Sequence, residues 1–311
     1  MKTRILIILL VIAVALPISS LALSDTERAD LQTFLIRKIP PRPARSMTGS
    51  EFAKSVFRLD KGRREQAIRE QLVAGNLPDF LRRLKPVRFS HRSTDGRVVE
   101  LTVFVMPDYL AIGSNDDFLL IPMSLPTALE VALDYGFILP TRKIVDAIFG
   151  QSAIHLAPQP LPAGPRMVST AYFEAHNQKI EKQRLLLRWL PGELIAGHKK
   201  DVVVTNRLIR RVGKIAIYGW HYASGSPIQP LSTVHGANYA DYSHGIRLIS
   251  DTVLLNGEPR SIYEILEDPA LSPLLSDEGP LGKIRDLMTR YLWPPLRAAE
   301  KPAMRATRFH S

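Results

Sequence analysis

Cysteine is absent from this chain of 311 residues. Its absence excludes disulfide bonds, thiolate metal ligands and any thiol nucleophile. Aromatic residues are few, at 7%, and no segment reaches the roughly 18 consecutive apolar residues of a membrane-spanning helix. The fold therefore depends on an ordinary hydrophobic core. With 45% hydrophobic residues, the chain can build one large domain or two small ones.

The N-terminus has the order of a secretory signal peptide. A basic start with Lys2 and Arg4 precedes the apolar run Ile5–Leu16, and small residues follow Pro17. This pattern predicts cleavage after Ala22 and a secreted or periplasmic protein. An uncleaved anchor is the alternative, but the proline and the serines behind it disfavour a continuous helix. We expect no stable membrane span after signal cleavage.

The formal net charge is +11, and it is +9 without Lys2 and Arg4. A basic protein attracts anionic partners. For an exported protein these are envelope polymers or lipid head groups rather than nucleic acid, and no basic module with interleaved aromatic residues argues otherwise. We therefore expect an anionic envelope polymer as the partner.

Composition and periodicity divide the chain after the signal peptide of residues 1–22. The proline-rich, basic stretch Ile39–Arg45 marks a linker over 23–47. A helical and mixed part over 48–186 and a β-rich, site-bearing part over 187–293 follow, and residues 294–311 form a basic, disordered tail. The predicted fold class is α+β, with an N-terminal helical part followed by a β-rich C-terminal part.

Local signals place several elements. The capping box from Thr48 to Glu51 begins a helix, and alternating apolar residues over 97–106 predict a strand that pairs with the run around 87–89. Asn256–Gly257 predicts a tight hairpin turn. Further helices are expected over 126–135, 141–149, 171–186 and 281–292.

Four of the eight histidines lie between Gly197 and Arg247, in short contexts rich in glycine, aromatic and acidic residues. Glycine beside histidine lets the backbone bend sharply and expose the ring. A single histidine of this kind is usually a half-buried turn residue. Four in one stretch favour a functional site.

The hexapeptide Ser243-His244-Gly245-Ile246-Arg247-Leu248 resembles the signature of the YkuD-type L,D-transpeptidases, exported enzymes that act on peptidoglycan through an acyl-cysteine. The resemblance implies an upstream histidine as base, a role that either His221 or His235 matches. Ile246 stands where that family has its cysteine. Without a thiol the acyl-enzyme cannot form, so the resemblance implies a different chemistry here.

Three chemical interpretations remain open. In the first, Ser243 or Ser232 is the nucleophile, a histidine is the base, and Asp241 or Asp201 orients the ring. In the second, a divalent metal, most plausibly zinc, is held by His198, Asp201 and His221 and activates a water. In the third, histidine and aspartate act as general acid and base on a polysaccharide or a peptide.

A fourth interpretation is a non-catalytic glycan- or peptidoglycan-binding protein. Five aromatic residues could stack on sugar rings: Tyr218, Trp220, Tyr222, Tyr239 and Tyr242. The same residues are equally typical of a β-sheet core.

The combined evidence predicts an exported hydrolase of a cell-envelope polymer, peptidoglycan or polysaccharide, with or without a metal. The expected catalytic residues are His221, His244, Asp241, Asp201 and Ser243. The expected substrate-binding residues are Arg247 as an anion clamp, Trp220, Tyr242, Lys199 and His235.

Overall fold

The computed structural model describes residues 24–92, 96–282 and 284–297. The predicted signal peptide and most of the predicted tail lie outside these ranges. The helices are α1 Asp25–Leu35, α2 Gly49–Val56, α3 Lys61–Val73, α4 Leu125–Tyr135, α5 Arg142–Gln151, α6 Thr170–Leu186, α7 Arg207–Arg210, α8 Ile262–Glu267 and α9 Ile284–Arg297.

The strands are mostly short. They are β1 Lys85–Arg92, β2 Val98–Val105, β3 Ala111–Gly113, β4 Phe118–Leu120, β5 Phe137–Ile138, β6 Ile154–His155, β7 Ile195–Ala196, β8 Lys200–Val202, β9 Ile217–His221, β10 Pro227–Ser232, β11 His244–Gly245, β12 Ile249–Ser250, β13 Thr252–Leu255 and β14 Glu258–Ser261. Most helices precede most strands, which confirms the α+β class.

Local sequence signals account for several of these elements. The Thr48 side chain accepts from the Glu51 amide and the Glu51 carboxylate accepts from the Thr48 amide, which completes the predicted capping box of α2. β1 and β2 form the predicted antiparallel pair, with Phe89 opposite Leu101. At the β13–β14 turn, Asn256 and Gly257 both have positive φ, as a type I′ turn requires.

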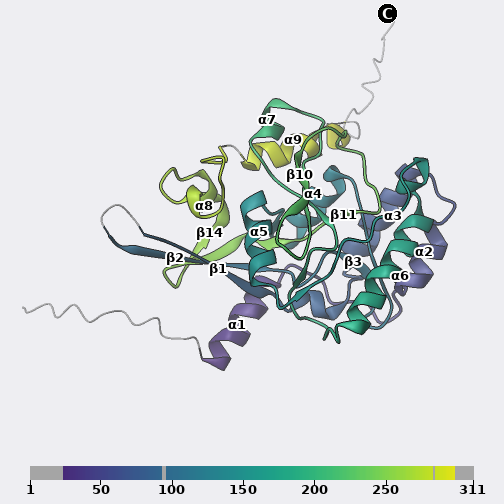
Figure 1. The fold of residues 1–311 in the computed structure, drawn as a ribbon, viewed down its shortest axis with the longest axis horizontal. Coiled ribbons are helices and arrows are strands. Elements are labelled where there is room, and N and C mark those ends of the chain that lie inside the picture. Colours follow the sequence, from purple (N-terminus) through teal and green to yellow (C-terminus); the bar gives the residue numbers. More distant parts are fainter. Residues whose placement is uncertain (1–23, 93–95, 283, 298–311) are drawn as a thin grey trace, which may run out of the picture.

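One sheet joins the two predicted parts of the chain. Its order is β14-β13-β2-β12-β5, and β1 pairs with β2. β2 comes from the N-terminal part, whereas β12, β13 and β14 come from the C-terminal part. A single hydrophobic core extends through both parts. In Figure 1, α2, α3 and α6 gather at one end and the β1–β2 hairpin projects from the other.

Two boundaries differ from the prediction. The linker assigned to 23–47 contains α1, which begins with a capping box between Ser24 and Glu27 and buries Leu35 at its last turn. The burial of its last turn stabilises this helix, and the proline-rich stretch begins only after the helix has ended. At the other end, α9 continues to Arg297 and so covers the first four positions assigned to the tail.

Candidate functional site

The predicted site residues lie around a small four-stranded sheet of order β10-β9-β8-β11. β8 and β11 are parallel, with His244 opposite Lys200 and Gly245 opposite Asp201. Neighbouring residues of a strand point to opposite faces. Lys200 and Asp201 therefore belong to different faces, and the predicted site separates into two clusters.

The first cluster, called the Asp146 cluster, consists of Asp146, Tyr218, His221, Asp201 and Tyr109. His221 Nε2 lies 3.1 Å from Asp146 Oδ1, and the Tyr218 hydroxyl donates to the same oxygen at 2.8 Å. The Tyr109 hydroxyl donates to Asp201 Oδ2 at 2.9 Å. The cluster thus joins α5, β8, β9 and the loop after β2.

Gly219 brings the two halves of this cluster together. Its φ is +103°, and a Cβ at this position would lie 3.4 Å from both Asp201 Oδ2 and His221 Nδ1. A Cβ on this backbone would press on the His221 ring, 3.2 Å from its Cε1 atom, so glycine suits the position. His221 thus contacts Asp146 through Nε2, and the buried carboxyl group of Asp201 lies near Gly219 without a hydrogen bond to the ring among those the structure describes.

The two carboxyl groups differ in their surroundings. Asp201 is buried, and burial raises the pKa of its carboxyl to about 6, although Arg247 and the hydrogen bond from Tyr109 act in the opposite direction. The Asp146 side chain keeps 44% of its surface exposed. A carboxyl group that titrates near neutral pH, close to a histidine paired with a solvent-facing carboxylate, is typical of an acid–base site.

The second cluster, called the His244 cluster, consists of Lys200, His235, Tyr239, Asp241, Ser243 and His244. Ser243 donates from its hydroxyl and from its amide to Asp241 Oδ1, at 2.6 and 2.8 Å. The Tyr239 hydroxyl donates to Asp241 Oδ2 at 3.1 Å. The Tyr239 ring stacks on His235 at 4.1 Å and lies 5.7 Å from His244. Asp241 is thus the centre of this cluster.

His244 is the least satisfied member. Neither ring nitrogen has a hydrogen-bond partner among the described residues, and the closest ion-pair contact is Asp241 Oδ2 at 3.8 Å. Burial lowers the pKa of the His244 imidazole below its usual value. Burial by itself would raise the pKa of Asp241, but His244 and the hydrogen bonds from Ser243 outweigh it and lower the pKa.

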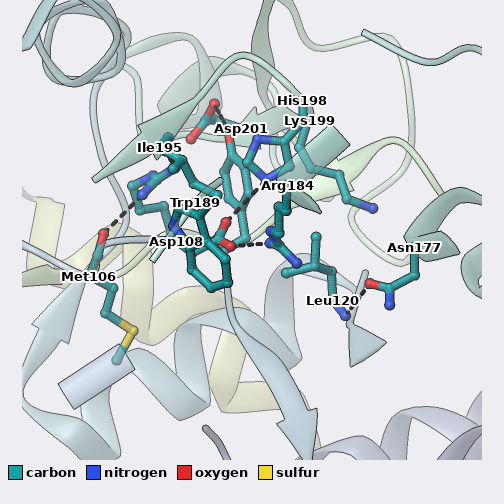
Figure 2. Close-up of polar contacts among 12 residues, drawn as sticks. Met106, Asp108, Leu120, Asn177, Arg184, Trp189, Ile195, His198, Lys199 and Asp201 are labelled. Atoms are coloured by element: carbon teal, nitrogen blue, oxygen red, sulfur yellow. Dashed lines mark hydrogen bonds and ion pairs between the residues drawn. The ribbon is translucent and has the colours of Figure 1, made fainter. Parts of the chain in front are cut away.

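A third polar group lies deeper and is structural. Asp108 pairs with Arg184 and accepts from His198 Nε2 at 3.1 Å, and these side chains are almost wholly inaccessible (Figure 2). Burial alone would raise the pKa of Asp108, yet Arg184 and His198 lower it well below its usual range. Buried charges need such partners. His198 is therefore a buried core residue held by Asp108.

Several predicted substrate contacts are corrected by the structure. Arg247 is fully buried, donates to the carbonyl oxygens of Met106 and Ile195 at 2.9 and 2.7 Å, and stacks on Tyr109, so it cannot clamp an external anion. Lys199 is also buried and donates to the Tyr242 carbonyl at 2.6 Å. Both side chains donate hydrogen bonds to backbone carbonyl groups because they are buried.

The aromatic residues predicted to stack on sugars are also corrected in part. The Tyr242 side chain is buried, and its hydroxyl accepts from the Leu161 amide at 2.8 Å. Trp220 is 6% exposed, and its ring lies 5.0 Å from the Lys200 amine. Tyr239 and His235 keep partial exposure and can still contact a ligand.

The predicted zinc site does not form in this arrangement. Among the described residues, no three histidine, aspartate or glutamate side chains are placed to hold a metal ion. His198 is engaged by Asp108, Asp201 accepts from Tyr109, and His221 turns toward Asp146. The three proposed ligands therefore point to three different partners.

For Ser243, the serine interpretation lacks the expected histidine partner. The hydroxyl of Ser243 donates to Asp241 rather than to a histidine. Ile246, at the position of the transpeptidase cysteine, is fully buried in the core. His176, on α6, is fully buried against the Tyr242 ring.

Sequence reasoning missed Asp146 and Tyr109 as members of the Asp146 cluster. Asp146 lies on a helix whose apolar residues face the core, and its carboxylate has the pattern of an ordinary solubilising residue. Only the packing of α5 against β9 brings it to His221. No sequence signal marks that contact.

Comparisons of the chain with protein-family models, with curated proteins and with solved structures found no match. The resemblance to the L,D-transpeptidases is neither supported nor refuted by them. Within the described part of the chain, every helix is too short or too polar to cross a membrane.

Proposed function

We propose that this protein is an exported hydrolase of a cell-envelope polymer, peptidoglycan or polysaccharide, and that the Asp146 cluster is its acid–base centre. The observation that carries the proposal is the contact of His221 Nε2 with the solvent-facing carboxylate of Asp146, in a cluster that also holds the buried carboxyl group of Asp201, whose pKa is about 6. The signal-like N-terminus and the net charge of +11 support an exported protein with an anionic substrate.

Donor and acceptor chemistry assigns a role to each group. An ionised carboxylate only accepts hydrogen bonds, so Nε2 of His221 carries the proton that it shares with Asp146. The Tyr218 hydroxyl donates to the same oxygen, Oδ1. His221 and Tyr218 are therefore positioning residues, and they leave Oδ2 of Asp146 for a water or a substrate group. Asp201 accepts from the Tyr109 hydroxyl and belongs to the same cluster.

The proposed step is a hydrolysis with Asp146 as general base. Oδ2 takes a proton from a bound water, and the water oxygen bonds to the electrophilic carbon of the substrate. The scissile bond of that carbon breaks, its leaving atom takes a proton from solvent, and Asp146 returns its own proton to solvent. The step needs no nucleophilic serine and no metal ligand.

The test uses the full chain on purified peptidoglycan and on an acidic polysaccharide, with release of amino groups and of reducing ends as separate readouts. Asp146→Asn and His221→Gln should each lower the turnover rate by about 100-fold or more, the usual contribution of a general base and its partner. Asp116→Asn, at an exposed carboxylate elsewhere, should leave it unchanged. A chelator should also have no effect.

The alternative is a non-catalytic glycan-binding protein, which the half-exposed stack of Tyr239 on His235 favours. Tight polymer binding with no product from either substrate would overturn the hydrolase. Loss of that binding in Tyr239→Ala would then establish the alternative. Turnover that survives in Asp146→Asn would place the chemistry outside the Asp146 cluster.

A further inference from the structure

The turn after α6 exposes an unusual amount of apolar surface. We call residues 185–190 the leucine turn. Its four leucines are far more exposed than ordinary leucines, with exposed fractions of 79% for Leu185, 81% for Leu186, 49% for Leu187 and 64% for Leu190. Single exposed apolar residues are common, but a contiguous group usually marks an interaction site.

The backbone of the leucine turn is well defined. The amide of Arg188 donates to the Leu185 carbonyl and the amide of Trp189 to the Arg184 carbonyl, which together form a Schellman motif. Arg188 takes the left-handed position of this motif with φ of +53°. Glycine usually fills that position, because a side chain there costs on the order of 1 kcal/mol.

Packing under the turn holds the leucines outward. The Trp189 ring packs edge-on against Phe80 at 5.3 Å and over the Arg184 guanidinium at 4.8 Å. The Glu193 carboxylate accepts from the Leu190 amide at 2.7 Å. Trp189 thus anchors the turn to the core, and the leucines project from a fixed base.

The charges around the leucine turn are mainly positive. Lys179, Lys182 and Arg188 are exposed. The neighbouring acidic groups are engaged, since Glu181 pairs with Arg184 and Glu193 holds the Leu190 amide. Leucines flanked by lysine and arginine are typical of segments that bind the surface of anionic membranes.

We propose that the leucine turn inserts its side chains into the headgroup region of an anionic phospholipid bilayer, while Lys182 and Arg188 contact the lipid phosphates. A second copy of the chain fits less well. Four leucines on a projecting turn offer on the order of a few hundred Å² of apolar area, short of the roughly 800 Å² that each partner of a standard protein interface buries. Insertion into a bilayer requires no minimum interface area of this kind. This site lies outside the Asp146 cluster and does not depend on the proposed function.

The test is co-sedimentation of the full chain with phosphatidylglycerol vesicles and with phosphatidylcholine vesicles. The triple variant Leu185→Ser, Leu186→Ser, Leu190→Ser should bind phosphatidylglycerol vesicles about 10-fold or more weakly, because each buried apolar group adds to the partition free energy. The matched control is Ile209→Ser with Val212→Ser, two exposed aliphatic residues elsewhere, and it should bind as the parent does. All variants have the same N-terminal residues, so a difference in vesicle binding between them comes from the substituted side chains.

A second variant separates charge from folding. Arg188→Gly relieves the left-handed strain and keeps the Schellman motif, so the protein should stay folded. Its binding to phosphatidylglycerol vesicles should nevertheless weaken about 5-fold, which is the share expected of one interfacial cation. Its binding to phosphatidylcholine vesicles should not change.

Two results with the triple-serine variant would overturn the proposal, and so would one result with the parent. One is unchanged binding to phosphatidylglycerol vesicles in the triple-serine variant. The other is a parent that forms dimers in sedimentation velocity and loses them in the same variant, since the leucine turn would then join two copies of the chain. Equal binding of the parent to both lipids would remove the role of Lys182 and Arg188 and would reject the proposal as stated.

Discussion

The hydroxyl of Tyr109 donates a hydrogen bond of 2.9 Å to Asp201 Oδ2 in the interior of the protein. Tyr109 follows β2 and Asp201 lies in β8, so the bond ties the N-terminal half of the chain to the small sheet. Tyr109→Phe removes the donor and leaves a buried carboxyl oxygen unpaired. We expect the free energy of unfolding to fall by about 1 to 3 kcal/mol.

The loss in Tyr109→Phe should be larger at pH 7.5 than at pH 5. Above its pKa of about 6, Asp201 is ionised and depends more strongly on its donor. Urea unfolding at both pH values measures this difference. The control is Tyr291→Phe, which removes a hydroxyl that donates to the neutral carbonyl of Lys214. Equal losses at both pH values for Tyr109→Phe would contradict the burial of a titrating Asp201.

Asp201 itself should make the stability depend on pH in acid. The pKa of its carboxyl is about 6 in the folded state and about 3.9 for a free aspartate. Between these values the folded state binds more protons than the unfolded state. The free energy of unfolding therefore falls as the pH rises from 4 to 6, by up to about 3 kcal/mol.

Asp201→Asn removes this titration and keeps the shape of the side chain. Relative to the parent, its stability should rise as the pH rises from 4 to 6. Urea unfolding across this range gives both curves. Asp116→Asn, at an exposed position, should follow the parent curve. Parallel curves for the parent and Asp201→Asn would refute the raised pKa.

Lys199 should make the free energy of unfolding depend on pH in the opposite direction, at higher pH. Burial lowers the pKa of its amine to about 7, against about 10.4 for a free lysine. Between these values the unfolded state binds more protons, so this residue makes the free energy of unfolding rise with pH, by up to about 4 kcal/mol. Lys199→Met should lack this rise when unfolding is measured from pH 7 to pH 10. Lys179→Met removes an exposed lysine and should keep it.

Gly219 should tolerate no side chain. Gly219→Ala places a Cβ 3.2 Å from His221 Cε1 and 3.4 Å from Asp201 Oδ2, on a backbone with φ of +103°. We expect a loss of about 1 to 2 kcal/mol of stability and of most hydrolytic activity. The matched control is Gly213→Ala, which has φ of +77° but open space around the new Cβ. Gly213→Ala should strain the backbone as Gly219→Ala does, but it should keep the activity. Equal activities in the two variants would separate Gly219 from the site.

Signals that act within a few residues were readable from the sequence. The capping box at Thr48, the alternation of β2 and the Asn256–Gly257 turn each depend on local backbone geometry, and each is found where it was predicted. The same kind of signal stands at Ser24 and Glu27, where α1 begins within the stretch predicted as a linker. Local rules thus placed several helices, the two hairpins and the α+β class.

The sequence also indicated that the stretch from Gly197 to Arg247 is chemically unusual, since its histidines, aspartates and glycines are visible as residues. What each side chain contacts was decided by tertiary structure. Alternation in β8 sends Lys200 and Asp201 to opposite faces, burial assigns Arg247 and His198 to the core, and the packing of α5 brings Asp146 to His221. Burial and pairing between distant segments set these roles because they depend on contacts that no local pattern encodes.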